Sequence, residues 1–347
     1  MIPILYNSDE TSFASNGLGR LHDTISCRCS EERNGIYELE FEYPVAGVRF
    51  DQIQPGMIIA VSHDATGDVQ PFDIIGYTKP INGIVTFRAV HVSYRLNNVI
   101  NLSTGVFRNL TAALNRLNNS AKGTPFVFSA DFTKSGTATC CASGIPISLK
   151  AMMGGVDGSI LDAYGGEWEF NLFSCRLKQS RGSASPLVIR YGKNLLDYTE
   201  DTDFSETFNC CYAYWSADEP EIAWARSGLP TFDGRDRVVA LDLSSKYETR
   251  PTTLEADAIA YMRNNQTNLP QQSITVDFVQ HGTDSMFSDL SVCKLCDTVG
   301  IEYPQYGLSG TMKVVKTVWD PLQERYSEIE LGSLKTSLSG ALFGEKR

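Results

Sequence analysis

Alternation of apolar and charged residues with a period of two dominates residues 24–43 and restricts this part of the chain to β-strands. In the returning strand, residues 37–43, large apolar residues alternate with three glutamates, Glu38, Glu40 and Glu42. A two-residue turn would place Cys27 opposite Glu42 and mix the apolar and acidic faces, whereas a three-residue loop at 33–35 places Cys27 opposite Phe41. The sequence therefore predicts a hairpin closed by a type I turn and a bulge, with Gly35 at positive φ.

The rest of the chain continues mostly in strands, with short helical stretches between them. A second hairpin is expected from strands near 72–79 and 84–94. Helices are predicted at 111–120, within 147–164 and at 252–265, where Thr252 and Glu255 form a capping box. Further strands are predicted at 167–177, 187–195, 207–217, 237–244, 273–279, 311–320 and 325–332. Residues 181–186 are expected to form a turn.

These elements predict a mainly β fold with α+β insertions, in which two similar β-barrel domains lie toward the two ends of the chain. The expected boundaries are a first barrel at 1–104 completed by about 187–243, an inserted α+β domain at 105–186, a helical connecting segment at 244–272, a second barrel at 273–335, and a tail or linker at 336–347. A chain of 347 residues is long for a single hydrophobic core, which agrees with several domains.

Charge and composition exclude several classes of protein. The chain has 30 basic and 41 acidic residues, a net charge of -11, and no Lys/Arg-rich run. Because nucleic-acid affinity depends largely on basic groups that displace phosphate counterions, a conventional DNA- or RNA-binding role is disfavoured. The same charge would suit a wall past which DNA slides. Neither a secretory signal nor an apolar run long enough to cross a membrane is predicted.

Nine cysteines, an odd number, favour a reduced and cytosolic protein over a disulfide scaffold. They are Cys27, Cys29, Cys140, Cys141, Cys175, Cys210, Cys211, Cys293 and Cys296. Cys293 and Cys296 have the spacing of half a zinc site or of a redox pair. A second such motif is missing, and His281 has no second histidine beside it, so buried small residues are the favoured interpretation and any metal at Cys293 and Cys296 stays open.

Two groups of acids could carry chemistry. The acidic run comprises Asp197, Glu200, Asp201 and Asp203. It lacks the central glycine and terminal glutamate of a calcium-binding loop, so a solvated loop is favoured. Glu38, Glu40 and Glu42 would lie ~7 Å apart on one strand face, within reach of a glycosidase pair. Alternating exposed glutamates occur in any half-solvated sheet, and this second interpretation is preferred.

The histidines and tryptophans also have a functional and a structural interpretation. The histidines are His22, His63, His91 and His281, and each is expected to be packed or solvated, since the nucleophile, zinc-protease and phosphate-loop motifs are missing. The tryptophans are Trp168, Trp215, Trp224 and Trp319. They could line a carbohydrate groove if exposed, but core packing is favoured. No catalytic, cofactor or metal residue is assigned, and no cofactor is expected.

Several segments resemble the prophage endopeptidase tail, or minor structural protein, family of siphophages and prophages. The resemblance is strongest at 17–47, which contains GLGRLHDTISCRCSEERNGIYELEFEYPVAG. It continues in the same order through the segments 71–94, 152–170, 189–203 and 320–332. These segments are structural signatures of the family and do not indicate an active site.

The resemblance implies a fold similar to the hub of contractile-tail baseplates, in which three subunits with two barrels each form a pseudo-sixfold ring. Such a homotrimer would sit at the virion tail tip after assembly in the bacterial cytoplasm. It would close or continue the tail tube and link the distal tail protein to the host-contacting tip, with the tape-measure and receptor-binding proteins as further possible partners. DNA would pass through the lumen without specific binding.

Many relatives carry a C-terminal peptidase, muralytic or host-binding region, and the expectation is that such activities lie outside residues 1–347 and that this chain is not an enzyme. Two alternatives to the hub stay open. One is a cell-wall hydrolase working through carboxylates among Glu38, Glu40 and Glu42 or at 197–203. The other is a carbohydrate-binding receptor module.

Overall fold

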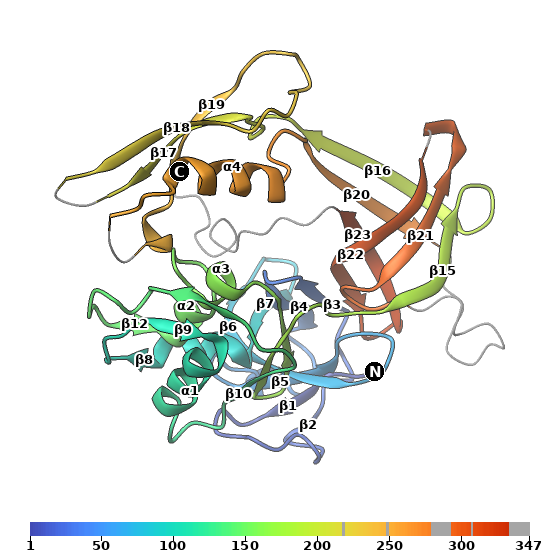
Figure 1. Ribbon diagram of the computed structural model, residues 1–347. Coiled ribbons are helices and arrows are strands. Elements are labelled where there is room, and N and C mark those ends of the chain that lie inside the picture. The colour runs from blue at the N-terminus through green and yellow to red at the C-terminus, as the bar shows by residue number, and fades with distance from the viewer. Residues whose placement is uncertain (217–218, 248–249, 279–292, 307, 333–347) are drawn as a thin grey trace.

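The computed structural model describes residues 1–216, 219–247, 250–278, 293–306 and 308–332 (Figure 1). Strands hold 43% and helices 15% of the residues, so the predicted mainly β fold with smaller α+β parts is confirmed. A 13-stranded sheet runs through both ends of the chain, and its strands fall into two modules that we call the N-terminal and C-terminal modules.

The N-terminal module has the strand order β3-β4-β7-β6-β5-β1-β2. Its strands are β1 (Ile4–Tyr6), β2 (Gly19–Arg20), β3 (Ser26–Glu32), β4 (Tyr37–Pro44), β5 (Ile58–Ser62), β6 (Val69–Thr78) and β7 (Ile84–His91), with the short helix η1 (Phe50–Gln52) between β4 and β5. The predicted hairpin register is confirmed, because Cys27 lies opposite Phe41 and Cys29 opposite Leu39. The second predicted hairpin corresponds to β6 and β7.

The turn between β3 and β4 differs from the prediction in one residue. Asn34, not Gly35, takes the positive φ, at 54°. Asparagine tolerates this region better than most residues, and here its side chain is also held. The Asn34 amide donates to the Gly166 carbonyl at 3.0 Å and accepts the Trp168 N–H at 2.8 Å. The turn therefore holds the inserted domain, described next, against the β3–β4 hairpin.

The inserted domain, residues 92–181, has its own core around Leu117, Met152, Tyr164 and Cys175. Its elements are η2 (Val92–Asn98), β8 (Ile100–Asn101), β9 (Phe107–Asn109), α1 (Leu110–Ser120), β10 (Val127–Ala130), β11 (Ser135–Ala138), β12 (Ile147–Ser148), α2 (Leu149–Met153), α3 (Ile160–Tyr164), β13 (Glu167–Asn171) and β14 (Ser174–Lys178). Each α-helix begins where a side chain accepts a backbone N–H, and these N-caps are Asn109, Ser148 and Ser159. The single strand expected at 167–177 is a hairpin that turns at Leu172, whose φ is 53°.

The C-terminal module has the order β16-β20-β23-β22-β21-β15. Its strands are β15 (Ala184–Arg190), β16 (Leu195–Asp203), β20 (Gln271–Phe278), β21 (Thr298–Tyr303), β22 (Leu308–Asp320) and β23 (Arg325–Gly332), with η5 (Pro304–Tyr306) before β22. The expectation that 187–243 completes the first barrel is not met by this pairing, since β15 pairs with β21 and β16 with β20. Period-two alternation identifies strands but carries no information on their partners.

Residues 204–270 form a second insertion, where the sequence indicated strands and a connecting helix at 244–272. Its three-stranded sheet has the order β18-β17-β19, from β17 (Cys210–Trp215), β18 (Glu221–Arg226) and β19 (Val238–Asp242). After η3 (Ser244–Lys246), α4 (Leu254–Asn264) packs Ala258 and Met262 against Cys211 and Ala213 of this sheet. The predicted capping box is wrong: the N-cap is Thr253, and its hydroxyl donates to Asp257 at 2.8 Å.

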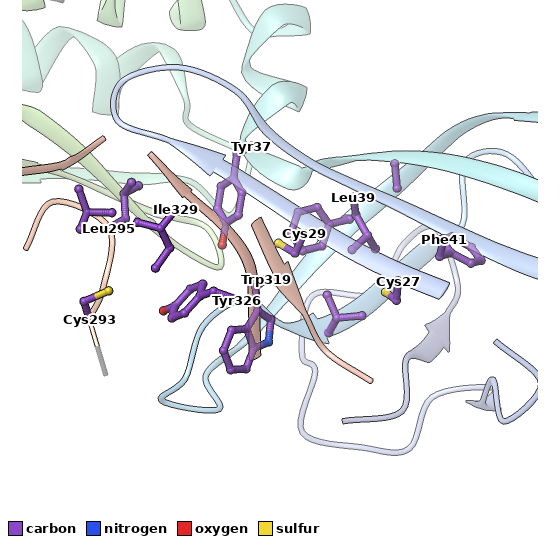
Figure 2. Packing of buried hydrophobic residues seen from close by; sticks show 14 of the residues in the cluster. Cys27, Cys29, Tyr37, Leu39, Phe41, Cys293, Leu295, Trp319, Tyr326 and Ile329 are labelled. Carbon is purple, nitrogen blue, oxygen red and sulfur yellow. The ribbon is translucent and has the colours of Figure 1, made fainter. Parts of the chain in front are cut away.

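One long strand, β22, belongs to both modules. Its first half pairs with β21, its second half pairs with β3 on the same edge, and β23 runs along the other edge. The buried residues of the two modules accordingly form one continuous cluster. Figure 2 shows Cys29 and Tyr37 of the N-terminal module gathered near Trp319 and Tyr326 of the C-terminal module. The two strand modules therefore share one core.

Candidate functional site at the junction of the modules

The site lies where β22 changes its partner from β21 to β3, and we call this point the fork. Thr317 of β22 lies opposite Glu31 of β3, and the Arg33 N–H donates to the Val315 carbonyl at 2.9 Å. On the other side of the fork, the Val314 N–H donates to the Asp297 carbonyl at 2.8 Å. The inserted domain reaches the same point through residues 181–183, so three parts of the chain meet here.

Glu31 and Arg181 form a buried ion pair at the fork. Arg181 Nη2 lies 3.0 Å from Glu31 Oε1, and the two side chains are only 10% and 6% exposed. Arg181 Nη1 also donates to the Trp168 carbonyl at 2.8 Å. Burial alone would raise the pKa of the Glu31 carboxyl, but the charge of Arg181, together with His63, lowers this pKa to about 2. Glu31 is therefore a fixed anion.

His63 lies on the opposite side of Glu31 from this arginine. His63 Nδ1 is 3.4 Å from Glu31 Oε2, and His63 Nε2 is 3.9 Å from Asp64 Oδ2. Burial would lower the pKa of His63, but the hydrogen bond and charge of Glu31, followed by Asp64, raise it. The imidazole is thus biased toward its charged form between two carboxylates.

Glu167 forms a second ionic contact beside the first. Its Oε1 lies 2.6 Å from Lys313 Nζ and 3.3 Å from Arg33 Nη1, while its Oε2 accepts the Arg181 N–H at 2.6 Å. Burial would raise the pKa of Glu167, but these donors lower it. One carboxylate of the inserted domain therefore binds cations from both modules.

A cleft of about 440 Å³ opens beside these ion pairs. Its lining is mainly polar and comes from all three parts of the chain: Glu31, His63, Asp64, Asp68, Gln70, Glu169, Phe170, Asn171, Lys178, Arg181, Gly182, Ser183, Lys294, Leu295, Asp297 and Thr317. Two of the acids are already engaged, because Lys178 pairs with Glu169 at 2.7 Å and Asp297 accepts the Ser183 N–H at 2.7 Å. These ion pairs and hydrogen bonds hold the three parts of the chain together. Glu31 is paired with Arg181 and Glu169 with Lys178, so neither is placed as a proton donor.

The structure places the glutamates of β4 on an exposed or half-exposed sheet face. Glu40 lies between Arg28 on β3 and Arg88 on β7, and Glu42 accepts the Ser26 hydroxyl at 2.9 Å. Cations and a hydroxyl therefore surround them, as the preferred interpretation of a half-solvated sheet expects.

The acidic run adopts a different conformation from the expected one. Residues 197–203 lie in β16, an edge strand paired with β20, and are not a solvated loop. Glu200 accepts the Tyr198 hydroxyl at 2.6 Å within this strand. Exposed acids on an edge strand discourage unselective pairing with other chains, which gives them a structural use.

The histidines do not gather at one site. His91 is fully buried and stacks on Tyr37 with ring centroids 4.3 Å apart, and burial holds its pKa well below the ordinary range. His22 is exposed, and His281 lies outside the described residues. Among the histidines that the structure describes, His63 alone takes part in the fork.

Cys293 and Cys296 are both buried in the shared core, and burial raises the pKa of each thiol to about 12. Within the described part of the chain, no cluster of three or more His, Cys, Asp and Glu side chains that could hold a metal ion includes this pair. The packing interpretation of this pair is the one that the geometry favours.

The tryptophans divide into two sets. Trp168 and Trp319 are 2% and 3% exposed, and their indole N–H groups donate to Met153 and Ser62, both at 3.3 Å. Trp224 is 44% exposed and packs against Tyr212 with centroids 4.9 Å apart. Two of the four residues needed for a carbohydrate groove are thus core residues.

Sequence reasoning missed Arg181 and Lys150. Arg181 lies at the start of the turn expected at 181–186. The one signal for a partner in the sequence is that Arg181 follows the strand that carries Glu167 and Glu169. Lys150 of α2 is 5% exposed, with its ammonium 5.0 Å and 4.7 Å from the ring centroids of Tyr94 and Phe170. Burial lowers the pKa of Lys150 to about 8.

Among the described residues, none of the helices combines the length and apolar character that a membrane crossing requires.

Comparison with known proteins agrees with the resemblance seen in the sequence. Residues 184–341 match the prophage endopeptidase tail family, which places the match after the segment 17–47. No curated protein sequence matches the chain.

Solved structures extend the likeness to the fold of the whole chain. The prophage tail protein gp18 from Listeria monocytogenes is 15% identical, with a TM-score of 0.63 over 97% of this chain and 96% of that one. The 43 kDa tail protein of prophage MuSo2 from Shewanella oneidensis is 10% identical, with a TM-score of 0.63 over 97% and 99%. A tail protein from Neisseria meningitidis is 10% identical, with a TM-score of 0.61 over 98% of both chains. The protein therefore carries the prophage endopeptidase tail family pattern at 184–341 and the fold of prophage tail proteins over nearly its whole length.

Proposed function

We propose that this prophage tail protein is a structural hub of the tail tip, and that three copies form a pseudo-sixfold ring. The ring closes or continues the tail tube and links the distal tail protein to the host-contacting tip during DNA ejection. The tape-measure and receptor-binding proteins are further partners, and assembly takes place in the host cytoplasm. The chain works through shape and contributes no reacting group.

The observation that carries this proposal is the pair of strand modules in one chain. Because β22 pairs with β21 and with β3, the two modules are held in a fixed relation by backbone hydrogen bonds. Three such chains would supply six modules around a threefold axis, which is the stoichiometry that a threefold-to-sixfold adaptor requires. Three copies would also carry three times the net charge of -11, which suits a lumen that DNA crosses without binding.

The second insertion offers a surface for a neighbouring subunit. One face of the β17–β19 sheet is covered by α4, whereas the other bears Tyr212, Ile222, Trp224 and Val238, which are 54%, 61%, 44% and 48% exposed. Trp and Tyr dominate the binding energy of protein interfaces, and an apolar sheet face left open to water disfavours a monomer. We expect this face to contact the next subunit of the ring.

The oligomeric state tests the proposal. Light scattering after gel filtration should give the mass of three chains, and electron micrographs should show rings with a central hole. Trp224→Glu should reduce the trimer fraction at least about tenfold, since one anchor costs 2 kcal/mol or more at an interface. Val127→Glu, at an exposed apolar position on β10, is the matched control and should leave the trimer intact. A wild-type chain that stays monomeric at high concentration contradicts the ring.

A further inference from the structure

Cys140 and Cys141 occupy the two central positions of a β-turn. The Ala142 N–H donates to the Thr139 carbonyl at 2.8 Å and closes the turn. The N–H groups of Thr139 and Cys140 both donate to the Gly158 carbonyl, at 3.0 Å and 3.1 Å, and fix the turn against the start of α3. In a strand the side chains of adjacent residues point to opposite faces, but at the centre of this turn the two thiols come together.

The two sulfur atoms lie 3.9 Å apart. Asn101 Nδ2 donates to Cys141 Sγ at 3.4 Å. The two thiols therefore lie side by side, with an amide donor on one of them. Cys140 is half-buried, which leaves an approach from solvent.

We propose that Cys140 and Cys141 form a dithiol site for one soft divalent metal ion of the Zn²⁺ or Cd²⁺ class. Two thiolates bound to one tetrahedral ion at ~2.3 Å are separated by roughly 3.8 Å, close to the separation of the two sulfurs here. Soft thiolate ligands select such ions over Mg²⁺ or Ca²⁺. Binding forms two metal–sulfur bonds and releases the two thiol protons to solvent.

Protein ligands would fill only half of the coordination sphere. Over the residues that the structure describes, no third His, Cys, Asp or Glu stands close enough to complete a set. Water molecules would take the remaining positions, as in open zinc sites. Such a site binds its ion less tightly than a four-ligand structural zinc site does, but more tightly than any single thiol, because two thiolates hold the same ion.

The other cysteine pairs show why the turn matters. Cys210 and Cys211 are also adjacent in sequence, but they lie in β17, where Cys211 packs toward α4 and its neighbour points to the opposite face. Cys293 and Cys296 have the more familiar metal-type spacing, yet both are buried and burial raises their pKa values to about 12. Neither pair offers a thiol that is partly exposed to solvent, as Cys140 is.

The test is a Cd²⁺ titration of the reduced full-length chain under anaerobic conditions. Ultraviolet absorbance reports cadmium–thiolate bonds, and native mass spectrometry reports stoichiometry. We expect one tight equivalent in the wild type and a loss of affinity of at least about tenfold in both Cys140→Ala and Cys141→Ala. Cys210→Ala and the double variant Cys293→Ala/Cys296→Ala should retain that equivalent.

Retention of the tight equivalent in Cys140→Ala, or its loss in Cys293→Ala/Cys296→Ala, would overturn the assignment. Far-UV circular dichroism checks that each variant folds. A second measurement needs no variant: a trivalent phenylarsenical, which bridges two nearby thiols, should protect Cys140 and Cys141 from alkylation in peptide-mapped spectra. Alkylation of both residues at the unprotected rate would equally refute the site. Neither result depends on whether the chain forms a ring.

Discussion

Replacement of Arg181 by methionine tests the buried ion pair at the fork most directly. The change keeps the length and apolar stem of the side chain but leaves the Glu31 carboxylate, 6% exposed, with His63 alone. The pKa of Glu31 falls from an ordinary 4.5 to about 2 in the folded chain. At 1.36 kcal/mol per unit, this difference corresponds to about 3 kcal/mol of stabilisation. Removal of one partner of a buried pair costs roughly 3–5 kcal/mol, so the two magnitudes agree.

The same ion pair predicts how the stability of the chain depends on pH. Because the folded-state pKa of Glu31 is depressed, its contribution to stability is fully present above about pH 4.5 and is lost as the pH falls toward 2. In Arg181→Met the folded-state pKa of Glu31 should rise toward or above its ordinary value, because burial still raises it and the charge of Arg181 is gone. The loss of stability between about pH 4.5 and 2 should therefore be smaller in the variant than in the wild type, or reversed.

Urea unfolding followed by circular dichroism measures both effects. We expect Arg181→Met to lose about 3 kcal/mol at pH 7 and the double variant Glu31→Met/Arg181→Met to recover most of that loss. Arg226→Met is the matched control, since its pair with Asp236 is 60% and 44% exposed and should cost less than about 1 kcal/mol. A loss below about 1 kcal/mol in Arg181→Met, or a double variant as unstable as the sum of its parts, would refute the reasoning.

Three further outcomes are expected. Lys150→Met should stabilise the chain by roughly 1–3 kcal/mol at pH 7 in urea unfolding, because the folded state lowers the pKa of this lysine. The wild type should gain stability as the pH rises from about 8 toward 10.5, and the variant should lack this gain. Asn34→Gly should cost roughly 1–2 kcal/mol through its two lost hydrogen bonds to the inserted domain. Asn34→Ala should cost about 1 kcal/mol more, because alanine disfavours the positive φ; equal thermal midpoints for the two Asn34 variants would count against this account. Glu40→Gln should leave stability within about 0.5 kcal/mol of the wild type, as expected for a surface residue, and a larger change would show that its Arg28 and Arg88 neighbours form a stronger network than the exposed face suggests.

Local pattern predicted the elements well where one face of a strand is buried. The alternation at 37–43 determined the register of the β3–β4 hairpin, because a slip by one residue would bury Glu40 in place of Leu39. The same pattern did not predict that Asn34 would take the left-handed position. That choice depends on Gly166 and Trp168, which lie more than 130 residues away in the sequence.

Pairing between distant strands could not be read from the sequence. Residues 184–203 look like strands in either module, and only the packing of the complete chain assigns β15 and β16 to the C-terminal one. The fork escaped prediction for the same reason: Glu31, Arg181 and Lys313 are each ordinary charged residues in their own segments. Adjacent cysteines are equally ambiguous, since a turn at 139–142 and a strand at 210–215 give opposite geometries to the same dipeptide.

The strand shared by the two modules limits how the molecule can move. A pivot of one module against the other would have to break the hydrogen bonds that β22 makes with β3 or β21, and it would also separate the cations that Glu167 gathers from both sides. Each chain should therefore respond to mechanical load as one rigid body. The passage through the proposed ring would then widen by sliding at the contacts between chains or by displacement of the insertions.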